Sequence, residues 1–586
     1  MGQADHFILI LGGLVLLGIL AGVLSSRIGA PLLLVFLGVG MLLGEDGPGG
    51  LQFGNFRTTY VVGSVALAII LFDGGFRTPM SAVRMAWAPA TMLATVGVVV
   101  TAVVTAGFAM LAFDIDMSQA LLIGTIVAST DAAAVFLLLH QHGMELRKRL
   151  SATLEIESGA NDPMAIFLTI TLVTIIAAGG TASPFEIFQG FARQFLTGAV
   201  AGVAGGYLIS RSINKLELAA GLYPVFTVAA ALALFGLTQL IGGSGFLAVY
   251  LAGIVAGNRR LRARKLIGRF HDGMAWISQI LMFVMLGLLV TPTNLLKDIV
   301  PSTLVALALV FIVRPLAVFL SLIPFRFRLR ERIFIAWVGL RGAVPIFLAM
   351  IPVLGGLPHS LQYFNVAFLV VIVSLVLQGW TVPWLARRLR LQVPPRPEPS
   401  SRLDLDLLAS GDSDIIAYRV TDKSPIAHKK PGTLTLPTGA HVLAVLRDEQ
   451  VVAADKADHF MPGDLALMIS PPEQAFKLDR QFVPPTAERY LLGINVGDFA
   501  FAGTTPMKLL ADAYGLPVIE ADREKKLSRF LRERLGSKIG EGDVLAFGGT
   551  ELVVRELIDG EVSQVGLVLE PEPPLPILSR LRGMFR

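Results

Sequence analysis

The stretch 157-ESGANDPM-164 places polar side chains inside a run of residues that is otherwise apolar enough to cross a membrane. On a helix Glu157 and Asn161 lie four residues apart, as do Ser158 and Asp162, so the four side chains cover about 140° of one face. Ionisable side chains at membrane depth are costly and usually serve a function. The alternative is that this stretch is the hydrated cytoplasmic end of the helix.

The composition indicates a polytopic membrane protein with a soluble tail. Of the 586 residues 54% are hydrophobic and only 16% charged, whereas soluble proteins carry about 25% charged residues. Beyond Leu391 the sequence is that of an ordinary soluble protein. A spanning helix needs about 20 apolar residues. On that basis the sequence predicts thirteen membrane segments, at 7–26, 29–44, 59–76, 87–113, 117–140, 151–178, 186–211, 220–241, 243–257, 273–292, 299–323, 331–352 and 362–388.

Lysine and arginine alternate between the loops. The loops after odd-numbered segments are basic, as in 258-NRRLRARKLIGR-269, whereas those after even-numbered segments hold little more than Arg57 and Lys297. Since basic loops stay in the cytoplasm, we expect an inner-membrane protein with its N-terminus in the periplasm and its tail in the cytoplasm. The net charge of +5 then reflects these loops and contact with anionic lipid, not nucleic-acid binding. With no cysteine, disulfides and thiolate metal sites are excluded.

Two further segments carry polar groups together with signals for a break in the helix. The fifth, 124-GTIVASTDAAAVFLLL-139, has Asp131 near its middle beside Thr130, and the twelfth, 337-WVGLRGAVPIFLAM-350, has Arg341 among two glycines and a proline. Irregular backbone at this depth is tolerated only where it is buried or lines a cavity. Interrupted helices at corresponding positions of two halves indicate a transporter binding site.

Three other polar features allow more than one interpretation. Asp73 in 71-LFDGGF-76 either lines an ion path or ends a helix at the membrane surface. Arg341 could compensate the charge of Glu157. For Arg314, which precedes a proline in the eleventh segment, we expect a kinked helix with a snorkelling side chain and no transport role.

A buried carboxylate beside a helix break can hold either a proton or a monovalent cation, if hydroxyl and carbonyl oxygens complete the shell of that cation. Competition for one such site couples two opposing fluxes, provided that the site faces each side of the membrane in turn.

Four motifs together resemble the cation:proton antiporter superfamily, in its NhaP-like branch of monovalent cation/proton exchangers. They are LFDGGF, ASTDAAAVF, ESGANDP and GLRGAVP, on the third, fifth, sixth and twelfth segments. The resemblance covers the membrane part, about two-thirds of the chain. It implies an all-α membrane fold of inverted repeats with broken crossing helices, a homodimer formed through helices, and a core domain with elevator-like motion.

The resemblance also implies roles for individual residues. Asp162 would exchange cation for proton, and Asp131, Thr130 and Ser158 would complete the site. Asp73 stands where the family usually has glutamate, which leaves its role less defined. Glu157 and Arg341 would form a stabilising ion pair. Asn161 before Asp162, where the electrogenic branch has two aspartates, implies electroneutral exchange of one cation for one proton. No other metal and no catalytic residue is implied.

The tail divides by composition into smaller parts. A proline-rich linker at 389–404 follows the membrane domain, 1–388. Residues 405–482 are β-rich, with a hairpin predicted around 448-DEQ-450, and resemble the C-lobe of potassium-conductance regulators of the TrkA C-terminal type. Residues 483–572 resemble the transporter-associated domain of magnesium-efflux (CorC) and haemolysin-type (HlyC) proteins. We therefore expect α+β cytoplasmic domains, ending in a basic tail at 573–586.

No G-x-G-x-x-G motif follows a strand in the tail, so the sequence does not predict an NAD site. The resemblance leaves two roles for the tail, regulation by an unidentified nucleotide or stabilisation of the dimer alone.

These observations predict an antiporter that exchanges potassium for protons, with sodium as a second candidate substrate. Its predicted role is in potassium, pH and cell-volume homeostasis. The preference for potassium rests on the regulator-like tail. A sodium/proton antiporter and a tail-gated cation channel are the alternatives, and the channel would show currents without competition at Asp162. A membrane-embedded enzyme is disfavoured because the sequence offers no nucleophile–base pair and no cluster of metal ligands.

Overall fold

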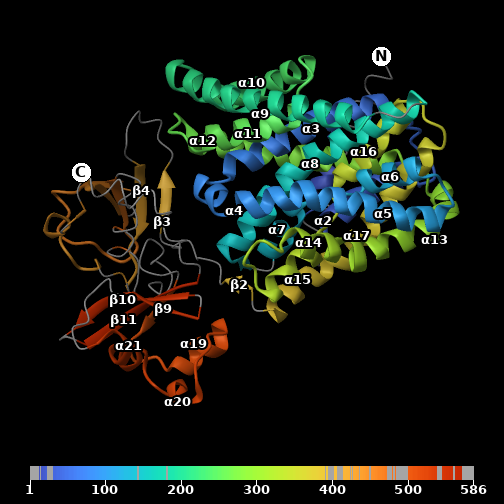
Figure 1. Ribbon diagram of the computed structural model, residues 1–586. Coiled ribbons are helices and arrows are strands. Elements are labelled where there is room, and N and C mark those ends of the chain that lie inside the picture. The colour runs from blue at the N-terminus through green and yellow to red at the C-terminus, as the bar shows by residue number, and fades with distance from the viewer. Residues whose placement is uncertain are drawn as a thin grey trace. The chain divides into compact units, whose positions relative to one another are not determined.

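The computed structural model (Figure 1) describes residues 31–141, 144–179, 183–389 and 391–393, parts of 12–22, and in the tail residues 402–405, 478, 482, 499–536 and most of 414–470 and 544–569. The chain divides into two compact units, Met1–Val393 and Pro394–Arg586. Each unit is described by itself.

The first unit is helical. Its described helices are α2 (Leu32–Leu43), α3 (Phe56–Arg77), α4 (Met80–Met92), η1 (Leu93–Gly97), α5 (Val98–Phe113), α6 (Met117–Ile126), α7 (Ala132–Gln141), α8 (Lys148–Ala177), α9 (Pro184–Lys215), α10 (Leu222–Leu240), α11 (Gly245–Gly257), α12 (Arg264–Leu288), α13 (Pro292–Ala308), η2 (Leu309–Val313), α14 (Arg314–Ser321), α15 (Leu329–Trp337), α16 (Ala343–Leu354) and α17 (Ser360–Arg388). The π-helical turns η1 and η2 join α4 to α5 and α13 to α14 without a break.

Among the described residues seven helices are long and apolar enough to cross a membrane, namely α3, α4–α5, α8, α10, α12, α13–α14 and α17. Five shorter apolar helices accompany them, α2, α6, α7, α11 and α16. The multi-pass helical fold is thereby confirmed, while the count of thirteen spans stays a prediction. The first predicted segment, 7–26, lies mostly outside the described residues.

Both predicted helix breaks are present. Residues 127–131 separate α6 from α7, and residues 338–342 separate α15 from α16. In the first break Asp131 caps α7, because its Oδ1 accepts a hydrogen bond from the Ala134 N–H at 3.1 Å. Aspartate, serine and threonine favour such caps over helix interiors, since their side chains bond the nearby backbone.

Three helices pack with their backbones almost in contact. Glycines of α9 and α11 face small residues or backbone of the next helix, so that an added Cβ would clash with it: Gly198, Gly202 and Gly206 of α9 meet Ser244, Ala248 and Ala252 near and in α11, and Gly253 and Gly257 of α11 meet α3 at Phe72 and Phe76. Small residues spaced by four bring membrane helices this close. We call α3, α11 and α9 the glycine slab; they lie in succession on one side of the unit (Figure 1).

The long helix α8 runs through the interior of the unit, beside α4, α6, α11 and α16. A two-stranded ladder, β1 (Glu145–Leu146) with β2 (Gln392–Val393), pairs the residues just before α8 with those after α17.

The second unit contains two antiparallel sheets, as expected of an α+β tail. The first has the order β3 (Arg402–Leu405), β4 (Asp414–Arg419), β7 (Leu465–Ser470), β5 (His441–Arg447), β6 (Gln450–Ala453). The predicted hairpin is confirmed, since Arg447 pairs with Gln450 across the turn. A short 3-10 turn, η3 (Pro431–Thr433), precedes β5.

The second sheet has the order β8 (Phe499–Ala502), β11 (Glu561–Val568), β10 (Thr550–Ile558), β9 (Val544–Phe547). Helices α19 (Met507–Tyr514), α20 (Glu520–Arg523) and α21 (Leu527–Leu535) connect β8 to β9. The domain boundaries and the family likenesses of the tail stay predictions, and the basic tail at 573–586 lies outside the described residues.

Candidate functional site

A cavity of about 430 Å³ lies where the first helix break meets α3, α7, α8, α11, α12 and the start of α16. Its wall carries several carboxylates and a single guanidinium group, from Asp73, Asp131, Glu155, Asp162, Asp272 and Arg77. A cavity with this excess of negative charge attracts cations.

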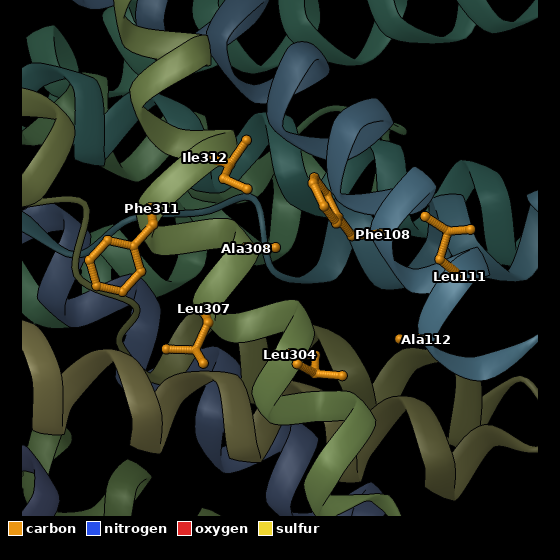
Figure 2. Close-up of a pocket in the computed structure, with 8 residues that line it drawn as sticks. All are labelled: Phe108, Leu111, Ala112, Leu304, Leu307, Ala308, Phe311 and Ile312. Atoms are coloured by element: carbon orange, nitrogen blue, oxygen red, sulfur yellow. The ribbon is translucent and has the colours of Figure 1, made fainter.

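A pocket of similar volume, about 440 Å³, has no such chemistry. It lies between α5 and the helix formed by α13 and η2, and Figure 2 shows the side chains that line it, Phe108, Leu111, Ala112, Leu304, Leu307, Ala308, Phe311 and Ile312. All are apolar, so this pocket suits hydrocarbon and not an ion. The polar cavity is therefore the candidate site.

Asp162 lies in the wall of this cavity, in the interior of α8. Its Oδ1 accepts a hydrogen bond from the Ser129 hydroxyl at 2.5 Å. Asp162 is 6% exposed, and Glu157 and Asn161 are each 1% exposed. Residues 157–164 are thus an interior part of α8, and they are not a hydrated end of that helix.

Ser158 and Asn161 tie the first helix break to α8. The Ser158 hydroxyl donates to the Thr130 carbonyl oxygen at 2.9 Å and accepts from the Ala132 N–H at 3.1 Å. The Asn161 Nδ2 donates to the Thr130 Oγ1 at 2.6 Å. These bonds bring three of the predicted residues, Thr130, Ser158 and Asn161, together around one stretch of unwound backbone, and they hold its oxygen atoms in place.

Asp131 joins the two breaks. Its backbone N–H donates to the Leu340 carbonyl oxygen at 2.7 Å, and its carboxylate lies against Gly342, where a Cβ would clash with it. Asp131 also lines the cavity. The glycine after Arg341 is therefore required for the close approach of the two breaks.

The predicted ion pair between Glu157 and Arg341 is wrong. Arg341 is buried, and its Nη1 donates to the carbonyl oxygens of Ala128 and Ser129, each at 2.6 Å. Those carbonyls follow α6, whose end carries unpaired acceptors and partial negative charge. The guanidinium thus bonds the broken helix and forms no direct ion pair with the glutamate.

Glu157 pairs instead with Arg314. The Arg314 Nη1 lies 2.7 Å from the Glu157 Oε1, and the two side chains are 4% and 2% exposed. The expectation that Arg314 snorkels to the membrane surface is therefore wrong as well. A buried carboxylate needs a charged partner, and a lone arginine in an apolar segment was the available signal for it.

Asp73 also lies in the cavity wall, near the end of α3. Its Oδ2 accepts from the Arg77 Nε at 2.8 Å, and the Arg77 Nη2 lies 2.8 Å from the Asp272 Oδ1. Asp73 is buried, and its Oδ1 has no hydrogen-bond partner among the residues described. This placement favours the ion-lining interpretation over that of a surface helix end.

Several polar side chains of the site were not predicted from the sequence, among them Ser129, Glu155, Arg77 and Asp272. Ser129, which bonds Asp162 directly, precedes the predicted Thr130. Both side chains carry a hydroxyl group, so the sequence does not tell which of them faces Asp162. Glu155 lines the cavity two residues before Glu157. From the sequence alone this position is expected at the hydrated start of the helix. In both cases the missing information was the path of the backbone.

Comparison with known proteins agrees with this geometry. Residues 13–388 match the family described as the sodium/hydrogen exchanger, transmembrane. The K(+)/H(+) antiporter NhaP of Alkalimonas amylolytica is 42% identical over 563 residues, which cover 96% of this chain and 98% of that protein. The K(+)/H(+) antiporter NhaP2 of Shewanella baltica is 39% identical, over 97% of this chain and 99% of the relative.

A solved structure supports the fold alone. The sodium proton antiporter MjNhaP1 from Methanocaldococcus jannaschii at pH 8 superposes with a TM-score of 0.56 at 22% identity, covering 64% of this chain and 99% of that one. The resemblance found in the four motifs is thereby confirmed over nearly the whole chain. This chain belongs to the sodium/hydrogen exchanger family, whose members exchange cations for protons.

Proposed function

We propose that this protein exchanges potassium for protons across the inner membrane, and that Asp162 binds the two ions in turn. The observation that carries the proposal is the buried Asp162, bonded to Ser129 in a cavity beside unwound backbone. Potassium is favoured because relatives named K(+)/H(+) antiporters match almost the full length of the chain, tail included.

The chemistry follows from the atoms around Asp162. A proton on the carboxylate needs no further ligand, whereas a cation needs several oxygen atoms. Ser129, Thr130, Asp131 and Ser158 line the same wall, and they carry hydroxyl, carbonyl and carboxylate oxygen atoms of that kind. Because each ion requires the same carboxylate, binding of one excludes the other.

Electroneutral exchange is proposed from the neighbour of Asp162. The Asn161 amide carries no charge and is bonded to Thr130. One carboxylate in this position then holds one proton or one monovalent cation per cycle.

The cavity is proposed to open toward the cytoplasm. Asp73 and His140 lie near the ends of α3 and α7, and Glu155 and Asp272 lie near the starts of α8 and α12. The distribution of basic loops supports a cytoplasmic location for all four helix ends, with the N-terminus in the periplasm.

Alternating access is proposed to use an elevator-like motion of a homodimer with thirteen spans. The two helix breaks at corresponding places of the two halves support inverted repeats. The cytoplasmic tail is proposed to regulate exchange; a nucleotide as its ligand is one form of that proposal, and stabilisation of the dimer alone is the other.

Exchange in proteoliposomes with an internal pH dye tests the function. We expect potassium to drive proton flux without net current, and Asp162→Asn to abolish it. Asp116→Asn is the matched control, because Asp116 is exposed in a loop and caps no helix with its side chain.

Three outcomes would contradict parts of the proposal. Dequenching by sodium but not potassium would establish the second candidate, the sodium/proton antiporter that the family description suggests. Currents carried by the cation alone would indicate a channel. Full activity of Asp162→Asn would overturn the assignment of the site.

A further inference from the structure

We propose that Glu155 is the residue that concentrates cytoplasmic cations in front of Asp162 and so sets the apparent affinity for the transported ion. This inference rests on the proposed exchange at Asp162, and it assigns a second carboxylate of the cavity to a separate task, entry.

The two carboxylates lie on one face of α8. Glu155, Ser158, Gly159 and Asp162 all line the cavity, at the spacing i, i+3, i+4, i+7 that places side chains above one another on a helix. Seven residues correspond to about 10 Å along the axis. Glu155 lies nearer the start of α8, which is the end that the basic residues Arg147–Arg149 assign to the cytoplasm.

Glu155 is held in place by an uncharged partner. The Thr78 hydroxyl donates to the Glu155 Oε1 at 2.6 Å. Thr78 follows α3, and its carbonyl oxygen accepts from the Asn258 Nδ2 at 2.8 Å. A hydroxyl orients the carboxylate and brings no positive charge to it.

The cations near the cavity are committed elsewhere. Arg77, the guanidinium of the cavity wall, contacts both Asp73 and Asp272 at 2.8 Å. Across the described residues no salt bridge involves Glu155. Its charge is therefore available to an incoming cation, whereas the charges of Asp73 and Asp272 are partly satisfied by Arg77.

The space between the two carboxylates is bounded by an aromatic ring. Tyr250 of α11 packs against Gly159, where a Cβ would clash with the ring. A cation leaving Glu155 thus has the polar face of α8 beside it on the way to Asp162.

The size of the effect follows from Coulomb's law. A unit charge about 10 Å away, at an effective dielectric constant of about 20, changes the local concentration of a monovalent cation by roughly tenfold, and salt reduces this. A loss of the Glu155 charge should therefore raise the apparent KM for the cation, while the maximal rate, which reports the chemistry at Asp162, should change little.

Everted vesicles, in which the cytoplasmic face is outside, provide the test. We expect Glu155→Gln to raise the KM for potassium about three- to tenfold with a maximal rate within about twofold of the wild type. Glu155→Asp, which keeps the charge, should restore most of the affinity. Glu217→Gln is the matched control, because Glu217 is an exposed glutamate in the loop after α9.

A second variant separates entry from a merely structural role. Thr78→Val removes the hydroxyl and keeps the carboxylate, so we expect its KM to stay near that of the wild type. If Thr78→Val and Glu155→Gln lower the maximal rate equally and leave the KM unchanged, their hydrogen bond only joins the helices, and the proposal falls.

A measurement on the wild type covers the case in which Glu155→Gln does not fold. Adding choline chloride should raise the potassium KM of the wild type at least about threefold between low and physiological ionic strength; no such dependence would overturn the proposal. If the wild type prefers sodium, the same comparison applies with sodium. Absence of exchange with either ion would refute the proposed function, whereas normal exchange with an unchanged KM in Glu155→Gln would refute only the role of Glu155.

Discussion

The two helix breaks are each five residues long and have opposite chemistry. The first contributes Ser129, Thr130 and Asp131 to the cavity, and these residues present oxygen atoms. The second contributes Gly342, and its charged residue, Arg341, is buried away from the cavity against the carbonyls of the first break. One break is thus built for the ion, and the other holds the first in shape.

This difference shows how a protein can place unwound backbone at membrane depth. Each break satisfies polar groups of the other, since Arg341 bonds two carbonyls and the Asp131 N–H bonds the Leu340 carbonyl. The partial negative charge of the carbonyls in the first break is thus balanced by Arg341 of the second. The carboxylate of Asp162 then remains for exchange.

The largest expected effect separates the two buried arginines. Arg314→Met leaves Glu157 without its partner and should destabilise the protein by about 3–5 kcal/mol, while the double variant Arg314→Met/Glu157→Gln should recover much of that loss. Thermal unfolding of the solubilised full chain measures both.

Arg341→Met is the matched comparison for this pair. Adding Glu157→Gln to it should give no recovery, because Arg341 serves the carbonyls of the first break. Equal rescue of both arginine variants would restore the rejected pair of Glu157 with Arg341.

The contact between the breaks is tested next by Gly342→Ala. The added methyl would meet the Asp131 carboxylate, and a displacement of about 1 Å at such a site costs on the order of a hundredfold in rate. Exchange in proteoliposomes measures it. Gly107→Ala in α5 should be close to wild type, because the position of the added Cβ is open. Comparable activity of both variants would contradict the close approach.

A smaller effect is expected from Ser129→Ala. It removes one hydrogen bond to a charged group, worth about 1.5–3 kcal/mol, and should raise the KM for the cation by about tenfold or more. Ser302→Ala is the control, since the Ser302 hydroxyl is buried and has no hydrogen-bond partner among the described residues. An unaltered KM in Ser129→Ala would remove this hydroxyl from the site.

The smallest effect concerns a comparable pair outside the membrane. Asp464 accepts hydrogen bonds from the Arg447 Nε and Nη2 at 2.9 and 2.8 Å. Burial alone would raise the pKa of Asp464, but the bonds from Arg447 and from the Met461 N–H outweigh it and hold the pKa below its usual value.

A lowered pKa fixes the sign of the pH dependence. The stabilisation from Asp464, about 1–3 kcal/mol, is fully present above the unfolded-state pKa of about 3.9 and is lost as the pH falls through the lower folded-state pKa. Hydrogen exchange of tail peptides in the full chain, compared between wild type and Arg447→Met, measures it. A difference that persists unchanged below pH 3 would contradict the assignment.

The sequence predicted the parts of the site that depend on local pattern. The helix breaks follow from glycine, proline and capping residues, and the face shared by Ser158 and Asp162 follows from helical spacing. The β5–β6 hairpin likewise follows from its turn and its alternating strands.

The local sequence pattern could not predict which side chains from distant segments pair with each other. Whether Glu157 meets Arg314 or Arg341 depends on how α14 and α15 pack beside α8, and both arginines are equally suitable by chemistry. Glu155 was hidden for the same reason, because only the packing of α3 and α11 turns the start of α8 into a cavity wall.

The glycine slab has a mechanical consequence. At its glycines, the helices α9, α11 and α3 touch through backbone and Cβ atoms. A change of rotamer therefore cannot loosen these contacts, and a methyl group added at one of the glycines would push the helices apart. Contacts of this kind are either kept or lost, because there is no intermediate packing of side chains. Since α3 and α11 also form one side of the cavity, that side belongs to a joint that side-chain motion alone cannot widen.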